Sequence, residues 1–441
     1  MKRYFESYLE EWKSRTSRKP LIVRGARQIG KTYTVEEFGR TNFERVIKIN
    51  FEEKPEFKSF FNTNEVDEIL LNINAYFNYK IEPGRTLLFL DEIQQCPQAI
   101  TTLRYFYEKI PGLHVIAAGS LLDHVLNDKK YSMPVGRIEF AYMHPLNFYE
   151  FLIALGEEGL VSYIENYKPD KAVSPPIHEK LLKYVRLYYF IGGMPEAVRE
   201  YSLNADIVTV ERIHESILRT LEYDFSKYGT RSQQETLVTV MRYIPAGLGR
   251  KVKYSNIDQS SRSDVIKTAI RLLMFSRIVH IIYHTKAAGI PLEQGKDTKI
   301  YKPLFFDIGL ANHILKLRLT DIDNLITINE GGLAEQFVGQ QMLSSEPFFL
   351  DPQLYYWTRE ARNSAAELDF LAEANNTIIP VEVKAGKTGT LKSLQVFIEE
   401  KKNKIALRLN ADQPSVTLFS SGCRLISLPL YLAGEWRRLI D

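Results

Sequence analysis

Short apolar runs alternate with amphipathic stretches along the first 145 or so residues of the chain. The apolar runs predict strands at residues 20–24, 45–50, 86–90, 114–118 and 137–143. The amphipathic stretches between them, such as residues 31–38 and 98–109, predict helices. Strands that alternate with helices are typical of a parallel sheet with helices on both faces. The pattern therefore predicts an α/β fold for this part.

The pattern changes twice further along the chain. Residues 145–230 are mainly helical in period, and residues 231–325 hold several short helical stretches before an apolar run at 278–283. The pattern after residue 325 predicts a second sheet. Its expected helices are 332–343 and 393–400, and its expected strands are 353–358, 367–371, 378–384 and 416–420. We therefore place domain boundaries after residues 144, 230 and 325.

Composition narrows the classes of protein. A chain of 441 residues is too long for one ordinary core, so two to four domains are expected. No run of about 18 apolar residues occurs, and the N-terminus MKRYFESYLEEWKSR lacks the apolar core of a signal peptide. We therefore expect a cytoplasmic location and no membrane partner.

Two cysteines, Cys96 and Cys423, exclude a disulfide framework and a cysteine-rich zinc site. A net charge of +3 neither requires nor forbids nucleic acid.

The stretch GARQIGKT at residues 25–32 fits the phosphate-loop pattern G-x-x-x-x-G-K-[ST], between a predicted strand and a predicted helix. Glycines at both ends let the backbone wrap a phosphate without Cβ clashes, and the helix N-terminus offers donors. Lys31 would reach the β- and γ-phosphates of ATP, and the Thr32 hydroxyl would bind Mg²⁺. The expected ATP-binding residues are Gly25, Ala26, Arg27, Gln28, Ile29, Gly30, Lys31, Thr32 and Tyr33.

A second element, TLLFLDE at residues 86–92, is an apolar strand that ends in two acids. Asp91 would hold Mg²⁺, directly or through water. Glu92 would orient and deprotonate the attacking water. The competing interpretation is a buried strand followed by a solvated acidic turn, which the upstream phosphate loop makes less attractive.

Three more residues have two interpretations each. Ser120, after the strand at 114–118, would sense the γ-phosphate or cap the next helix. Arg137 would contact phosphate in cis or from a neighbouring subunit, or would be a surface arginine before a strand. Arg27 would contact phosphate or be solvated.

These motifs carry a resemblance. Together with LLFLDEIQ at 87–94 and PVGRIEFAYMHPLNFYEF at 134–151, the phosphate loop resembles bacterial and archaeal AAA-type ATPases of the AAA_14 kind, which end in a DUF4143 region. YYFIGGMPEAV, KPLFFDIGLANHIL and ELDFLAEANNTIIPVEVKAG extend the match over nearly the whole chain. Ala26 and Tyr33 depart from the usual proline and threonine, but neither position supplies a required ligand. The resemblance implies an ATPase core at 1–144 and a helical lid at 145–230.

Residues 231–325 have the layout of a winged helix-turn-helix, which the resemblance also implies. Two groups of basic residues accompany it, Arg262, Lys267 and Arg271 on the expected recognition helix, and Arg250, Lys251 and Lys253 before it. One interpretation is contact with DNA. The other is that the module packs domains together and the charges are solvated. We expect the turn at residues 192–195, Gly-Gly-Met-Pro, to serve packing.

The C-terminal part carries an acid–acid–lysine set. On a strand, Glu382 and Lys384 share one face, and Asp369 from the paired strand would share a Mg²⁺ or Mn²⁺ ion with Glu382. Lys384 would stabilise the phosphorane or position water. Glu335 would be an outer carboxylate at the metal, and Gln395 a supporting polar group. The region resembles the restriction-endonuclease-like PD-(D/E)xK fold. The competing interpretation is an ion pair of Glu382 with Lys384 or Lys387.

Three functions follow from these patterns. The first is an ATP-hydrolysing protein that acts on DNA through a nuclease-like C-terminal domain, with ATP and Mg²⁺ as cofactors. The second is an ATP-dependent switch that binds a protein partner through an inactive nuclease-like domain. The third is a nucleotide-binding chaperone-like module. AAA-type cores often form hexamers, so an oligomer is a further expectation, to which Arg137 would contribute a contact in trans.

Overall fold

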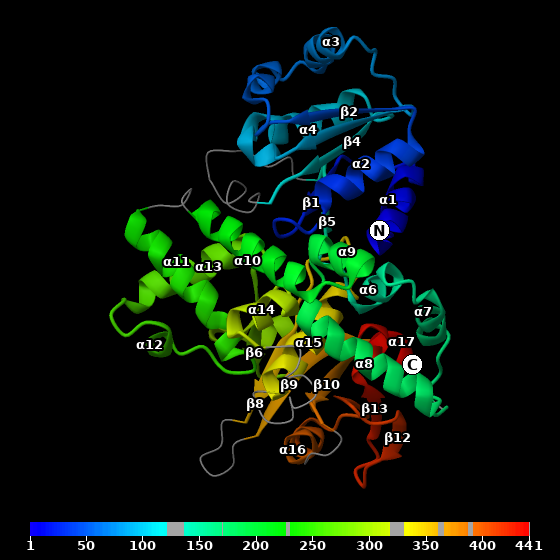
Figure 1. The fold of residues 1–441 in the computed structure, drawn as a ribbon, viewed down its shortest axis with the longest axis vertical. Coiled ribbons are helices and arrows are strands. Elements are labelled where there is room, and N and C mark those ends of the chain that lie inside the picture. Colours follow the sequence, from blue (N-terminus) through cyan, green and yellow to red (C-terminus); the bar gives the residue numbers. More distant parts are fainter. Residues whose placement is uncertain are drawn as a thin grey trace. The chain divides into compact units, whose positions relative to one another are not determined.

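A computed structural model describes residues 1–120, 136–169, 171–225, 230–317, 330–359, 366–386 and 391–440 (Figure 1). The chain divides into two compact units. Unit 1 comprises Met1–His144 together with the short segments Phe275–Ile278 and Pro347–Asp351. Unit 2 comprises the rest. The first unit therefore begins with the range expected for the ATPase core, but it also includes two later segments that the sequence did not indicate.

Unit 1 is built on a parallel sheet of order β2-β3-β4-β1-β5. Its strands are β1 (Leu21–Arg24), β2 (Arg45–Asn50), β3 (Thr86–Asp91), β4 (His114–Ala118) and β5 (Glu139–Tyr142). The predicted parallel α/β sheet is confirmed. β3 and β4 are buried along their whole length, because helices cover the sheet and leave no polar face.

Helices supply both layers around this sheet. They are α1 (Tyr4–Ser14), α2 (Lys31–Asn42), α3 (Val66–Phe77), α4 (Pro97–Lys109) and the 3₁₀ segment η1 (Pro55–Phe61). α2 contacts β2, β3 and β4, and α1 packs on α2. Alternate strand residues such as Ile22, Leu88 and Val115 form one core with α3, α4 and η1. Period-two alternation therefore assigns each strand residue to one of the two helical layers.

The two later segments close the β5 side of the sheet in unit 1. The Tyr142 backbone N–H donates to the Phe348 carbonyl at 2.7 Å. Arg277 makes two hydrogen bonds to Asp351, at 2.6 and 2.9 Å, and its guanidinium lies 4.9 Å from the centre of the Tyr142 ring. An edge strand with unpaired backbone groups is thereby covered.

Unit 2 is built on one mixed sheet of order β12-β13-β11-β10-β9-β8-β6-β7. Its strands are β6 (Val279–Thr285), β7 (Lys296–Phe305), β8 (Tyr355–Thr358), β9 (Glu367–Ala374), β10 (Thr377–Val383), β11 (Ile405–Asn410), β12 (Ser415–Leu418) and β13 (Arg424–Pro429). β6 pairs with β7 and also with β8. The apolar run at 278–283, expected within the winged-helix layout, is thus a strand of the C-terminal sheet, and a boundary at residue 325 would divide that sheet.

The helices of unit 2 share its core. They are α6 (Phe148–Ala154), α7 (Glu158–Glu165), α8 (Pro175–Ile191), α9 (Pro195–Asn204), α10 (Ile207–Asp224), α11 (Arg231–Tyr243), α12 (Tyr254–Ile257), α13 (Ser263–Phe275), α14 (Ile308–Leu315), α15 (Glu330–Ser344), α16 (Lys392–Lys401) and α17 (Trp436–Ile440). The Phe148 and Phe337 rings lie 5.8 Å apart, and the Phe148 N–H donates to Gln341 Oε1 at 2.8 Å. The segment expected as a separate lid therefore packs on α15 of the C-terminal part.

Buried Asp307 joins two of the motifs named above. Its carboxylate accepts hydrogen bonds from the Gly193 N–H at 2.6 Å and the Leu310 N–H at 3.0 Å. A Cβ at Gly192 would lie 2.2 Å from Asp307 Oδ1. Burial raises the pKa of Asp307 to about 6. The Gly-Gly-Met-Pro turn and the start of α14 thus form a packing joint, as expected for that turn. In the described ranges no helix is long and apolar enough to cross a membrane.

Candidate functional site

The GARQIGKT loop connects β1 to α2 in unit 1. Its backbone needs residues that tolerate positive φ, with Gly25 at φ 154°, Gln28 at 62° and Gly30 at 90°. A Cβ at Gly25 would lie 2.4 Å from the Met143 carbonyl oxygen, so only glycine fits beside the end of β5. α2 begins at Lys31, directly after the loop, and its free N–H groups point back toward the loop.

Lys31 lies across this loop. Its Nζ donates to the carbonyl oxygens of Gly25 at 3.0 Å and Ala26 at 2.6 Å, and its side chain is buried. Burial lowers the pKa of Lys31 to about 8, while Glu92 and Asp91 oppose the shift. Both hydrogen bonds of the ammonium group in the described part of the chain are thus made to neutral carbonyl oxygens. A triphosphate would give it the full counter-charge that it lacks.

The side chains of Thr32 and Asp91 contact each other, as the sequence predicts. Thr32 Oγ1 donates to Asp91 Oδ1 at 3.1 Å, and Oδ2 is 3.2 Å away. Asp91 is 2% exposed, and burial raises its pKa. A hydroxyl and a carboxylate at this separation fit Mg²⁺, which takes oxygen ligands and keeps several waters.

Two residues of β2 also contact Asp91, and the sequence prediction missed both. Asn50 Nδ2 donates to Asp91 Oδ2 at 3.0 Å, and Lys48 Nζ lies 3.6 Å from the same oxygen. Asn50 Oδ1 accepts the backbone N–H groups of Glu52 and Glu53. A signal was present in the sequence, because Lys48 and Asn50 alternate with apolar residues near the end of a strand that neighbours β3.

Glu92 and Ser120 lie after the neighbouring strands β3 and β4. Glu92 has φ 51°, accepts a hydrogen bond from Gln94 Nε2, and has its pKa raised by burial. A Cβ at Gly119 would lie 2.1 Å from Gln94 Oε1, so Gln94 lies between the two strand ends. Ser120 is 4% exposed, and within the described residues its Oγ has no hydrogen-bond partner. The carboxyl ends of β3 and β4 therefore present a candidate base and an unpaired hydroxyl.

The structure does not bring Arg137 to the loop in cis. Arg137 precedes β5, whose first residue Glu139 pairs with Leu21, at the opposite end of β1 from the loop. Its Nε donates to Glu108 Oε1 at 2.9 Å on the surface. Arg27 lies 3.3 Å from Glu52 Oε2, and Tyr33 is 58% exposed. Contact of Arg137 with phosphate within one chain is excluded by this geometry.

The acid–acid–lysine set assembles in unit 2. Asp369 Oδ2 on β9 accepts a hydrogen bond from the Val383 N–H at 2.7 Å. This contact lies just past the backbone pair of Phe370 on β9 and Val381 on β10. Glu382 is 5% exposed and pairs with Lys384 on the same face of β10. Burial raises the pKa of both acids, and the Asp369 charge raises that of Glu382 further. The predicted face of β10 is thus present, and so is the predicted ion pair.

Glu335 reaches this cluster from α15, together with a lysine that the sequence prediction missed. Lys302 Nζ on β7 lies 3.5 Å from Glu335 Oε2 and 2.6 Å from Glu367 Oε1. Burial raises the pKa of Glu335 well above its ordinary value, and the Asp369 charge adds to this. Among the described residues, however, no three His, Cys, Asp or Glu side chains are placed to hold a metal ion together. The cluster has the right charges but not the preformed geometry of a metal site.

The expected supporting residue Gln395 takes no part in this cluster. Gln395 lies on the exposed side of α16, while Leu394, Phe397 and Ile398 are the residues that the helix buries. The expectation of a supporting role is therefore not met. Lys387 lies outside the described residues.

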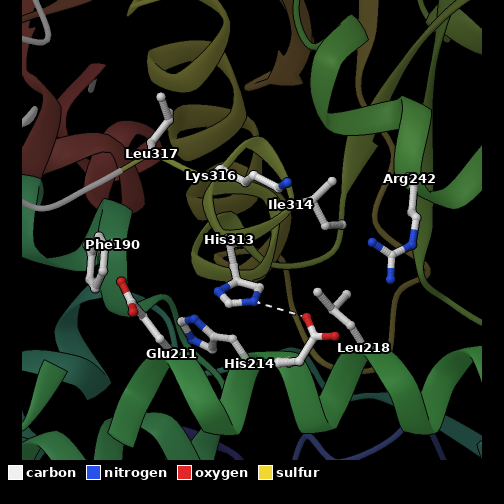
Figure 2. A pocket seen from close by; sticks show the side chains of 10 residues that line it. Phe190, Glu211, His214, Leu218, Arg242, His313, Ile314, Lys316 and Leu317 are labelled. Carbon is white, nitrogen blue, oxygen red and sulfur yellow. Dashed lines mark hydrogen bonds and ion pairs between the residues drawn. The ribbon is translucent and has the colours of Figure 1, made fainter. Parts of the chain in front are cut away.

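A separate cavity of about 300 Å³ lies between α10 and α14 in unit 2 (Figure 2). His313 Nε2 is 3.3 Å from Glu215 Oε2, and the His214 Nε2 donates to the Ile191 carbonyl at 3.0 Å. Burial lowers the pKa of His214 to about 4, so its ring is neutral. None of the predicted site residues lines this cavity; its polar contacts join α10 to α14 through Glu215 and to α8 through His214.

Family comparisons agree with the geometry of unit 1. Residues 17–152 match the model of an AAA domain, and the match includes the phosphate loop, Asp91 and Glu92. This part of the chain is therefore similar to AAA domains. Residues 330–431 match a domain of unknown function, DUF4143, and residues 182–321 match another, DUF8612. The DUF8612 match ends beyond β7, so the C-terminal sheet contains strands from both matched regions. No curated protein matches the chain.

Solved structures that are similar to part of this chain have low sequence identity to it. The Walker-type ATPase PABY2304 of Pyrococcus abyssi is 17% identical, with a TM-score of 0.45, over 71% of this chain and 95% of that one. The Aeropyrum pernix ORC2 protein, solved as ADPNP–ADP complexes, is 14% identical, with a TM-score of 0.35, over 73% and 91%. The A. pernix ORC1 protein in complex with DNA is 11% identical, with a TM-score of 0.31, over 72% and 93%.

Proposed function

We propose that the AAA domain binds ATP with Mg²⁺ and hydrolyses the γ-phosphate. The observation that carries the proposal is the hydrogen bond of 3.1 Å between Thr32 and Asp91, directly after the loop that holds Lys31. A hydroxyl, a carboxylate and an ammonium group converge at one end of the sheet. Bound Mg²⁺ would neutralise charge on the β- and γ-phosphates.

The residues of this chain would divide the work as follows. Lys31 would leave the Gly25 and Ala26 carbonyls and bind the β- and γ-phosphate oxygens. Glu92, whose pKa is raised by burial, would take the proton of the attacking water. Ser120 would donate its unpaired hydroxyl to the γ-phosphate.

The experiment for hydrolysis replaces Glu92 by Gln. Glu92→Gln should retain bound ATP and lower turnover by about 10²–10⁴-fold, the usual contribution of a general base. Phosphate release and a filter-binding assay measure the two effects on the same preparation. Glu56→Gln, an exposed acid in the same unit, is the matched control and should change neither. Turnover that survives Glu92→Gln would remove Glu92 from the role of base.

We also propose that unit 2 carries a nuclease-like centre acting on DNA. Asp369, Glu382 and Glu335 lie on three elements; burial raises the pKa of each, and neighbouring carboxylates add to this, Glu367 for Asp369 and Asp369 for the other two. Such crowding favours the arrival of a cation. Lys384 lies beside Glu382, where it could stabilise charge on a phosphorane.

Plasmid nicking tests this centre. Purified protein with Mg²⁺ or Mn²⁺ should nick supercoiled DNA, and Lys384→Ala should lose the activity. Lys404→Ala, a surface lysine before β11, is the control. Equal nicking by the wild-type protein and Lys384→Ala would assign the activity to a contaminant.

Exposed basic residues support contact with DNA. Arg250, Lys253, Arg262 and Lys267 are exposed around α12 and α13. Replacing Arg262 and Lys267 by Glu should weaken binding of duplex DNA and flatten its salt dependence.

A second candidate is an ATP-dependent switch that binds a protein partner and has no nuclease activity. The observation that favours it is that, within the described ranges, no three acids are placed to share a metal ion, while Lys302 is bonded to two of the carboxylates. Absence of nicking together with ATP-dependent capture of a defined partner would support the switch. Nicking that depends on Lys384 would exclude it.

A further inference from the structure

Lys302 is the first residue of the KPLFFDIG motif, and the proposed reactions do not use it. It extends from β7, and its side chain is 4% exposed. Its Nζ lies 2.6 Å from Glu367 Oε1 on β9 and 3.5 Å from Glu335 Oε2 on α15. A buried ammonium group thus bridges carboxylates from two different elements.

The balance of charge makes Lys302 central to the cluster. Four carboxylates gather there, on Glu335, Glu367, Asp369 and Glu382, together with the ammonium groups of Lys302, Lys384 and Lys251. Lys384 pairs with Glu382 and the half-exposed Lys251 pairs with Glu367, whereas the buried Lys302 contacts both Glu335 and Glu367. Burial alone would lower the pKa of Lys302, but Glu335, Asp369 and Glu367 raise it above its ordinary value. The group therefore stays charged at neutral pH.

The surroundings hold Lys302 in place. Its Nζ lies 5.1 Å from the centre of the Tyr356 ring, and Lys251 Nζ lies 3.3 Å from Glu367 Oε2. A Cβ at Gly249 would lie 2.9 Å from Glu335 Oε1, so the loop at this residue approaches the carboxylate closely. Lys302, Lys251 and Gly249 all come from the region that matches DUF8612, whereas the acids lie in the DUF4143 match.

We propose that Lys302 is the resident cation of this carboxylate cluster, and that a divalent metal ion binds there only in competition with its ammonium group. The inference rests on the proposed metal-dependent centre, since it concerns the same carboxylates, but it addresses affinity for the ion rather than cleavage. An ammonium group satisfies Glu335 and Glu367 by hydrogen bonds without drawing three acids around one point. That arrangement agrees with the lack, in the described part of the chain, of three acids placed around one ion.

The test measures Mn²⁺ binding by calorimetry and by the electron paramagnetic resonance signal of free Mn²⁺. Every protein carries Asp91→Asn, so that the nucleotide site contributes no metal binding. Lys302→Met keeps the length of the side chain and removes its charge, and it should bind Mn²⁺ at least tenfold more tightly than the parent. Lys299→Met, an exposed lysine on the same strand, is the matched control and should not change the affinity.

Two further variants locate the ion and guard against misfolding. Adding Glu335→Gln to Lys302→Met should remove the gain, whereas a gain that persists would place the ion elsewhere and overturn the proposal. If Lys302→Met does not fold, Lys302→Met with Glu367→Gln removes both charges of the closest pair. This double variant should bind Mn²⁺ more tightly than Glu367→Gln alone.

Two results would overturn the proposal and leave Lys302 a purely structural residue. The first is that folded Lys302→Met binds Mn²⁺ no more tightly than the parent. The second is that Glu367→Gln binds Mn²⁺ equally tightly with and without Lys302→Met. Cleavage of DNA is not a readout here. A wild-type protein that never nicks DNA would therefore contradict the proposed nuclease and leave this result unaffected.

Discussion

Replacing Asn50 by Ala tests how β2 prepares the nucleotide site. Asn50 Nδ2 donates to Asp91 Oδ2 at 3.0 Å, and Asp91 is almost fully buried. A hydrogen bond to a charged group contributes about 1.5–3 kcal/mol. If that energy fixes the Asp91 carboxylate for Mg²⁺, its loss should weaken the apparent Mg²⁺ affinity during ATP turnover by about ten- to a hundredfold.

The assay is steady-state ATP turnover at increasing Mg²⁺ concentration, with ATP binding measured separately in EDTA. Asn50→Ala should shift the Mg²⁺ midpoint and leave metal-free ATP binding within about twofold, because Asn50 contacts Asp91 rather than Lys31. Asn42→Ala, at the half-buried end of α2, where Asn42 Nδ2 donates to Thr41 and not to Asp91, is the control. An unchanged Mg²⁺ midpoint in folded Asn50→Ala would refute the reasoning and reduce Asn50 to a cap for the turn at Glu52.

Two further predictions concern the packing joint in unit 2. In a urea titration, Gly192→Ala should lower the free energy of unfolding by roughly 2–5 kcal/mol, because φ is 71° and the added Cβ would lie 2.2 Å from Asp307 Oδ1. Gly289 has open space around it, so Gly289→Ala should be nearly neutral in the same titration. Asp307→Asn tests the pKa of about 6 for the buried carboxyl group. Because this pKa lies above the unfolded value of 3.8, the stabilising effect of the group is complete below pH 4 and is lost as the pH rises to about 6. The difference in unfolding free energy between the wild-type protein and Asp307→Asn should therefore fall by about 3 kcal/mol over that window, and a flat difference would contradict the raised pKa.

Much of unit 1 could be predicted from the sequence because its signals are local. β2 and β4 begin and end where the apolar runs do, since each run is bounded by polar or turn residues. The phosphate loop and the two acids after β3 also lie within short stretches. α3 and η1 were not predicted. Their apolar residues take part in the core with β2 and β3, so their role is visible only in the fold.

The rest depends on pairing between distant segments. β6 and β7 belong to the sheet of β8–β13, a contact that no local period indicates. Lys302 and Glu335 are 33 positions apart in sequence, and each alone resembles an ordinary charged residue. The expected contact of Arg137 with phosphate in cis is absent from the described structure for a related reason. Arg137 precedes β5, which runs parallel to β1, so it lies at the end of the sheet opposite to the phosphate loop.

Direct titration with ATP is the sharpest test of the proposed nucleotide site. Calorimetry with Mg²⁺ and a non-hydrolysable ATP analogue should give saturable one-to-one binding to the wild-type protein. Lys31→Ala should weaken that binding at least a hundredfold, while Lys109→Ala, a surface lysine of the same unit, should match the wild-type protein. Equal affinity of Lys31→Ala and the wild-type protein would show that the GARQIGKT loop does not hold the phosphates.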